Sequence, residues 1–148
     1  MAFEQLVSFA DLQLASFADL PLRIMLGIVF LYHGYSKMLT KNGFMEHVKV
    51  VKSIGFKPPA FWTFCSAFAE FFGGLALLLG GFTRVAAVLI AINMLVAWYA
   101  KKFVWKSPFN IIQGGYEYDL VLIAAALTIA LLGAGPYSLD AIYSLPIS

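Results

Sequence analysis

The stretch FWTFCSAFAEFFGGLALLL, residues 61–79, decides the fold class of this chain. About 20 apolar residues in helical form span the hydrocarbon of a bilayer, which is roughly 30 Å thick. A lone strand would leave its backbone polar groups without partners in lipid, so the stretch is expected to be a helix. Its one charged residue, Glu70, then lies close to the middle of the membrane.

The composition of the whole chain is also that of a membrane protein. Of the 148 residues, 61% are hydrophobic and 12% are charged, whereas soluble domains have about 45–50% and about 25%. Apolar runs bounded by charge, Pro or Gly predict four spans, near residues 21–38, 61–79, 85–100 and 118–132. We therefore expect an all-α integral membrane four-helix bundle, formed by one domain over residues 21–148.

Two other segments have the pattern of short amphipathic helices. Residues 1–20 are acidic and contain the sequence SFADL twice, and residues 43–54 combine an apolar face with a basic one. In the second segment Phe44, Val48 and Val51 oppose Lys49 and Lys52. Because such helices lie in the plane of the membrane interface, we expect both segments to be interfacial.

The distribution of basic residues predicts the orientation in the membrane. The segments that follow the first and third spans hold eight of the ten Lys and Arg residues, when Lys37 at the edge of the first is included. Loops rich in Lys and Arg face the cytoplasm, which places residues 39–60 and 101–117 on that side. With four spans, both termini of this multi-pass protein are then outside the inner (plasma) membrane.

The first two spans each have one face that is expected to point inward. At about 100° per residue, the first face contains Gly27, Phe30, Gly34 and Lys37, all within roughly 40° of Arg23. The second carries small residues beside the carboxylate: Ser66, Glu70, Gly73, Gly74, Leu77 and Gly81. Small residues allow helices to approach closely, so Glu70 should face the bundle interior.

The last two spans show a weaker version of this pattern. The third has Ala86, Asn93, Ala97 and Ala100 on one face, and Asn93 is its interior polar group. The fourth begins with Glu117, which shares a face with Val121, Ala124 and Thr128. Four such faces predict a polar seam inside the bundle.

Depth suggests how the ionisable groups pair. Glu70 lies roughly 13 Å from the start of its span, where a charge costs at least about 2.5–3.5 kcal/mol and needs a partner or a proton. His33 matches this depth best, and Arg23 or Lys37 could also reach Glu70 with extended side chains. Arg23 approaches from the outer side, and Lys37 lies with Glu117 at the inner side. The cluster is either a network that fixes helix register or a site for a ligand or proton.

Several classes of site are not supported by the sequence. The chain has one cysteine, so neither an internal disulfide nor a C-x-x-C pair is possible. No nucleotide-binding glycine loop and no His/Cys metal cluster occurs, and His47 lies too far from the face of His33 for a bis-His haem. We predict no metal site and no nucleic-acid partner; the cofactor is unknown, and a quinone is the candidate.

Four motifs occur in a familiar order: RIMLGIVFLYHGYSK (23–37), AEFFGGLALLLGGFTR (69–84), GGYE (114–117) and GAGPYSLD (133–140). They resemble the DoxX family of small four-span membrane proteins, over residues 20–140. The resemblance implies an association with membrane redox systems, such as thiosulfate:quinone oxidoreductase. It also places Arg23, His33, Lys37, Glu70 and Glu117 at motif positions.

The resulting hypothesis is a DoxX-like inner-membrane subunit of a quinone-linked redox complex. Glu70 and His33 are the candidate catalytic residues, and Arg23, Lys37 and Glu117 are the candidate cofactor-binding residues. The partners are the lipid bilayer and other membrane subunits. The sequence leaves two alternatives, a non-catalytic accessory or assembly subunit and a small transporter or proton path. It also leaves open whether the chain is itself an enzyme, because it has no redox centre of its own.

Overall fold

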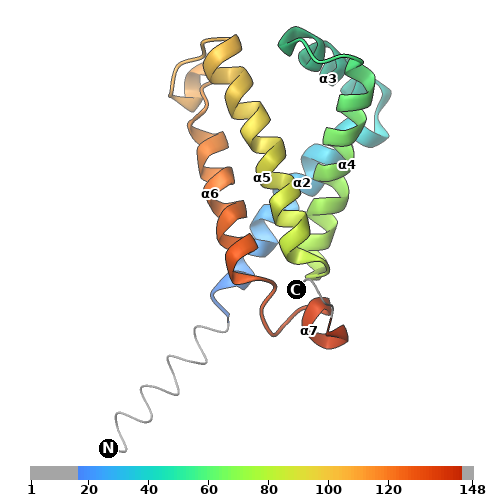
Figure 1. Cartoon of the computed structure of the whole chain (residues 1–148), viewed down its shortest axis with the longest axis vertical. Coiled ribbons are helices and arrows are strands. Elements are labelled where there is room, and N and C mark those ends of the chain that lie inside the picture. The colour runs from blue at the N-terminus through green and yellow to red at the C-terminus, as the bar shows by residue number, and fades with distance from the viewer. Residues whose placement is uncertain (1–16, 145–148) are drawn as a thin grey trace, which may run out of the picture.

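The computed structural model describes residues 17–144, and within that range all regular secondary structure is helical (Figure 1). Its α-helices are α2 (Asp19–Leu39), α3 (Lys41–Ile54), α4 (Pro59–Leu79), α5 (Thr83–Tyr99), α6 (Glu117–Leu132) and α7 (Leu139–Tyr143). A π-helical turn, η1 (Ala100–Val104), continues α5, and a 3₁₀ turn, η2 (Ile111–Gln113), precedes α6. Most of the predicted amphipathic segment 1–20 lies outside the described residues.

Local signals in the sequence set several helix ends. Pro59 is at the first turn of α4, where its missing N–H costs nothing. Gly80 ends that helix with φ of 67°, a left-handed conformation that glycine adopts without strain. Thr40 begins α3, because its side chain accepts a hydrogen bond from the backbone N–H of Gly43.

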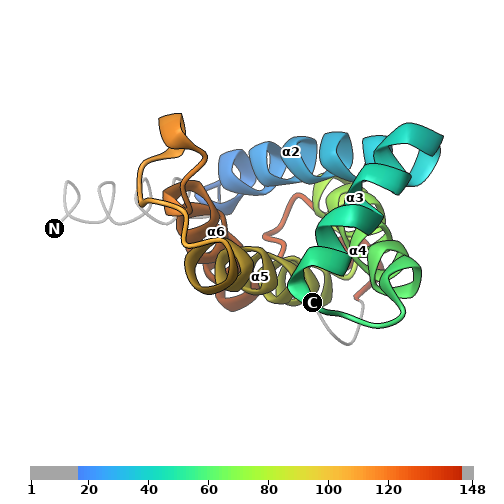
Figure 2. The ribbon, with the colours of Figure 1, turned by 90° about the horizontal axis from the view of Figure 1, so that it is seen from above.

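The closest helix pair is α2 with α4, which run antiparallel. A Cβ at Gly34 would overlap the backbone of Phe71, and a Cβ at Gly74 would overlap the backbone of Leu31. Glycine therefore lets the two backbones touch, as the small-residue faces predicted. The second pair is α5 with α6, and Figures 1 and 2 show these two helices side by side, with α2 running across behind α4 and α5.

The core lies where these pairs meet. Its largest fully buried apolar side chains are Phe30 from α2, Leu77 from α4, Ile90 from α5 and Ile129 from α6. Small residues of α5, such as Ala87 and Ala91, fill the space between them. The inward faces predicted for α2 and α4 are confirmed, since Arg23, Gly27, Gly34, Glu70 and Gly73 are all buried.

The inward face predicted for α6 is wrong. Val121, Ala124 and Thr128 are exposed, and the buried face consists of Asp119, Leu122, Ile123, Ala126 and Ile129. These two faces are about half a turn apart at 100° per residue. Because α6 is apolar all round after its first turn, the sequence contains no contrast between faces that would reveal the inward one.

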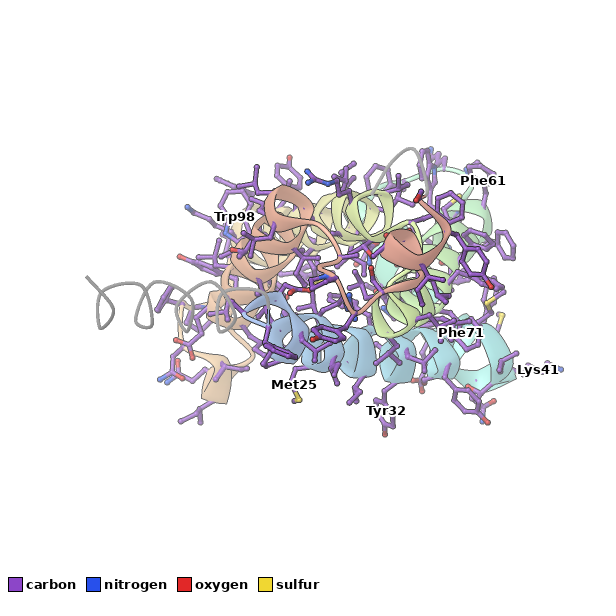
Figure 3. All side chains as sticks on the ribbon, turned by 90° about the horizontal axis from the view of Figure 1, so that it is seen from below. Met25, Tyr32, Lys41, Phe61, Phe71 and Trp98 are labelled. Atoms are coloured by element: carbon purple, nitrogen blue, oxygen red, sulfur yellow. The ribbon has the colours of Figure 1, made fainter. Side chains whose placement is uncertain are left out.

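The outer surface of the bundle is strongly apolar. Among residues 17–144, two helices are long and apolar enough to cross a membrane: α4, and the continuous helix Thr83–Val104 that α5 forms with η1. Large apolar side chains are exposed on every long helix, and Figure 3 shows Met25, Tyr32 and Phe61 projecting outward. Such a surface favours a lipid environment over water.

One end of the molecule is basic. Helix α3 lies across the ends of α2 and α4, and the segment that follows α5 lies at the same end (Figures 1 and 2). The amphipathic pattern predicted for residues 43–54 is confirmed: Val51 is buried, Phe44 and Val48 are partly buried, and Lys49 and Lys52 are exposed. The eight lysines of the chain therefore belong to this end.

Candidate functional site

Glu70 is buried, with 1% of its surface exposed, and has three hydrogen bonds. Lys37 Nζ donates to Glu70 Oε1 at 2.6 Å and to Oε2 at 2.7 Å. Asn93 Nδ2 donates to Oε1 at 2.7 Å. The cluster joins α2, α4 and α5, and Asn93 links α5 to α4 through a hydrogen bond of the kind that polar side chains form between membrane helices.

The helix geometry explains why Lys37 reaches Glu70. Gly34 lies one turn earlier on α2 and brings that helix against the backbone of Glu70 and Phe71. The Lys37 side chain then extends from the basic end toward the carboxylate, with 19% of it exposed against 1% for the Glu70 side chain. Lysine can bury its aliphatic stem in this way while its ammonium group pairs with the acid.

The expectation that His33 is the neighbour of Glu70 is wrong. His33 is exposed, and its ring lies edge-on to Tyr32 with centroids 6.0 Å apart. His33 does lie at the depth of Glu70, since the next residue, Gly34, contacts the backbone of Glu70. However, Phe30 and Gly34 form the buried face of α2, and His33 lies about 80° from the centre of that face. The long side chain of Lys37 therefore makes the contact that was predicted for the imidazole.

Arg23 lies at the opposite end and does not reach Glu70. Its guanidinium donates to the carbonyl oxygen of Ala134 and, at 2.8 Å, to that of Tyr137. Asp19 Oδ2 is 3.7 Å from Arg23 Nη1. Arg23 is 2% exposed, so its role in this structure is to fix the segment after α6 to the start of α2.

Glu117 is also separate from Lys37, contrary to expectation. Glu117 Oε1 accepts a hydrogen bond from the backbone N–H of Ile111 at 2.7 Å, which closes the turn before α6. Near Glu117, Lys101 forms an ion pair with Asp119, with Nζ 2.8 Å from Oδ2. The sequence GGYEYD contains both acids, but only the position of the buried α6 face shows that Asp119 is the inward one.

Asp140 caps the start of α5 and does not pair with Arg23. Its Oδ1 accepts from the N–H of Phe82 at 2.6 Å and its Oδ2 from the N–H of Thr83 at 2.9 Å. These are the first N–H groups of α5, which have no partner within the helix. The cap comes from a segment far along the chain, so it also fixes α7 against α5.

His47 is a titratable residue near the cluster that the sequence analysis did not select. It lies on the packed face of α3, and burial together with the charge of Lys37 lowers the pKa of its imidazole to about 4. The amphipathic pattern of residues 43–54 could have predicted that His47 is packed, because His47 lies beside Val51 on the apolar face.

The Glu70 cluster has the groups needed to hold a polar headgroup and to move a proton. Lys37 and Asn93 are hydrogen-bond donors, and Glu70 is an acceptor that can take up a proton. Between residues 17 and 144 no group of three or more His, Cys, Asp or Glu side chains is placed to hold a metal ion.

Comparison with known proteins bears on this cluster. The sequence pattern that defines the DoxX family matches residues 18–102, which include Lys37, Glu70 and Asn93. The chain belongs to the DoxX family. It is 33% identical over 119 residues, 80% of this chain and 81% of the other, to the Bacillus subtilis (strain 168) protein named "Putative oxidoreductase CatD". No solved structure matches this DoxX chain significantly.

Proposed function

We propose that this DoxX protein is a four-span inner-membrane subunit of a redox complex, and that its Lys37–Glu70–Asn93 cluster binds a quinone headgroup. The observation that carries the proposal is a carboxylate buried at 1% exposure between apolar helices, with two donor side chains on it. Ionisable groups within a membrane are costly and are therefore functional candidates. The name of the Bacillus relative supports an oxidoreductase association.

The four spans of the proposal are α2, α4, α5 with η1, and α6. With 21 residues α2 is about 31 Å long, and with 16 residues α6 is about 24 Å long. Aromatic and lysine side chains near the ends of α6 can place the shorter helix in the interface. By the positive-inside rule, the basic end with α3 faces the cytoplasm and both termini face outside.

A quinone suits this site chemically. Its two carbonyl oxygens accept hydrogen bonds, which Lys37 and Asn93 donate, and its reduction requires protons, which Glu70 can carry. Quinones move in the bilayer, so their site must open toward lipid. His33 is exposed one turn before Lys37 on α2, and in the proposal it contacts the headgroup on the lipid side.

The chain supplies no electron carrier of its own in this proposal. Electrons come from a partner subunit of the complex, so catalysis belongs to the assembly.

The test is quinone binding by the purified protein in nanodiscs, followed by native mass spectrometry and by quenching of tryptophan fluorescence. The Glu70→Gln variant should bind a short-chain quinone at least about tenfold more weakly, since Lys37 loses the carboxylate that orients its ammonium group toward the headgroup, and a hydrogen bond from a charged group is worth about 1.5–3 kcal/mol. Arg84→Gln, whose guanidinium bonds Ala130 O near the opposite end, serves as the control. Absence of quinone binding by the unmodified protein, or equal binding by Glu70→Gln, would sink the proposal.

A non-catalytic assembly role is the second candidate. It is favoured by the pairing within the cluster, in which both Glu70 oxygens accept hydrogen bonds from Lys37 and Oε1 accepts one from Asn93. A complete buried pair can fix helix register without a chemical role. If partner subunits still co-purify with Glu70→Gln but are lost when residues 1–20 are deleted, the assembly role is the better account.

A further inference from the structure

The packed face of α3 brings a second titratable group toward the Glu70 cluster. Gly43 lies so close to α2 that a Cβ there would overlap the carbonyl oxygen of Ser36, the residue before Lys37. His47 is one turn further along α3, on the same face as Gly43 and the buried Val51. The contact at Gly43 thus directs the imidazole toward the end of α2 that carries Lys37.

The other ionisable groups around His47 point elsewhere. Helix α3 packs against α2 and α4. On α2 the facing charge is Lys37; on α4 the one acid is Glu70, and Lys57, just before α4, is exposed. On α3 itself, Lys41, Glu46, Lys49 and Lys52 are exposed. Lys37 is therefore the group that connects His47 with the carboxylate.

A free hydroxyl lies along the same direction. Gly34 of α2 lies opposite Glu70 and Phe71 of α4, and Gly27 lies opposite Gly74 and Leu78. The two helices are therefore antiparallel, and the N-terminal end of α4 is the one that approaches α3. Thr63 is seven residues before Glu70, on the same face and about 10 Å nearer that end. It is fully buried, and its Oγ1 has no hydrogen-bond partner within the described chain. This hydroxyl can donate and accept between the α3 end and Glu70.

We propose that His47 is the residue through which protons from the basic surface reach Glu70, with Lys37 as the link between them. Lys37 Nζ is already 2.6 Å from Glu70 Oε1, a distance at which its proton can transfer to the oxygen. The N–H bond of Lys37 breaks as the O–H bond of Glu70 forms. The neutral amine then takes the proton of the His47 imidazolium, and His47 regains one from water.

The net result is one proton moved from water to Glu70, without an oxidant or reductant. The lowered pKa of His47 fits this order, because burial and the nearby charge of Lys37 both make an imidazolium there give up its proton readily. The inference rests on the proposed function in one respect, namely that Glu70 carries a proton for a bound headgroup.

The first measurement is the rate of Glu70 protonation after a rapid drop in pH, followed by infrared spectroscopy of the full-length protein in nanodiscs. The carboxylic acid C=O band assigned to Glu70 is the one missing in Glu70→Gln. His47→Gln should slow the appearance of the Glu70 band by at least about tenfold. This is a small effect beside the rate enhancement that a positioned acid usually gives. Lys49→Gln is the control, since Lys49 is an exposed titratable residue on the same helix as His47.

Equal rates in the unmodified protein and His47→Gln would overturn the inference, and so would a Glu70 band that never appears. A second measurement does not depend on the fold of His47→Gln. In nitrogen-labelled protein, Lys37→Met should raise the pKa of His47, because the charge of Lys37 is one cause of its lowering. Lys49→Met should leave it unchanged, and equal pKa values in the two variants would reject the link. Quinone binding is measured separately, so rapid Glu70 protonation without it rejects only the proposed function.

Discussion

Glu70 carries a charge that the apolar helices around it would not otherwise tolerate. Its two oxygens are held by Lys37 and Asn93, so the carboxylate is compensated within the protein. This pairing makes Lys37 important for stability, because a buried charge that loses its partner is far more costly than a complete pair. The energetics of the cluster can therefore be tested without knowledge of its ligand.

Lys37→Met should lower the free energy of unfolding by about 3–5 kcal/mol, because it leaves the Glu70 carboxylate buried and unpaired. The double variant Lys37→Met with Glu70→Gln should recover most of that loss, since no net charge remains in the core. Thermal or denaturant unfolding of the purified protein in detergent measures both. A Lys37→Met variant as stable as the unmodified protein would mean that the ion pair contributes nothing.

His47 predicts a pH dependence of stability. Its pKa is about 4 in the folded protein and 6.5 when unfolded, so between these values the unfolded chain binds more protons. Stability then falls as the pH drops from 7 toward 4. His47→Gln should reduce the difference in melting temperature between pH 7 and pH 5, and His33→Gln should not. If all three proteins lose the same stability, another group is responsible.

At the scale of helices, the pair α2–α4 forms the frame of the site. The sequence revealed both of its inward faces, because glycines and charges interrupt otherwise apolar runs on one side. It did not reveal the face of α6, which lacks such contrast, or the choice of Lys37 over His33. That choice depends on how far each side chain reaches across the helix pair, which spacing along one helix does not report.

Gly34→Ala tests the contact between the two helices. The added methyl group would overlap the backbone of Phe71 and push α2 away from α4. We expect a loss of about 1–3 kcal/mol, as for other overpacked cores, and a longer Lys37–Glu70 distance. Gly81→Ala is the control, because its Cβ would be 3.8 Å from Leu139, an ordinary contact. Unfolding curves that coincide for the two variants would contradict the close packing.

Asp140 acts on another element, the start of α5. Its carboxylate accepts from two N–H groups there, so Asp140→Ala should cost about 1–2 kcal/mol, the usual loss for a helix cap. Asp140→Asn should keep part of the stability, since its amide oxygen can still accept one bond. Denaturant unfolding separates the three proteins, and an Ala variant that matches the Asn variant would rule out capping as the main contribution.

At the scale of the whole molecule, the two ends differ in character. One end carries α3 and the lysines, and the other carries Arg23, Asp140 and the loop between α6 and α7 (Figure 1). A ligand that reaches Glu70 along Lys37 therefore comes from the basic half of the bundle. Which compartment that half faces decides where protons for the site originate.

Cysteine labelling in cells determines this orientation. In a Cys65→Ala background, the exposed residues Asn42 and Ser144 are replaced singly by cysteine. A membrane-impermeant maleimide should label Ser144→Cys in intact spheroplasts and Asn42→Cys only in inverted vesicles, because lysine-rich loops stay in the cytoplasm. Labelling of both positions from one side would mean that an even number of spans separates them. The reversed pattern would place α3, and the proton source for Glu70, on the outer face.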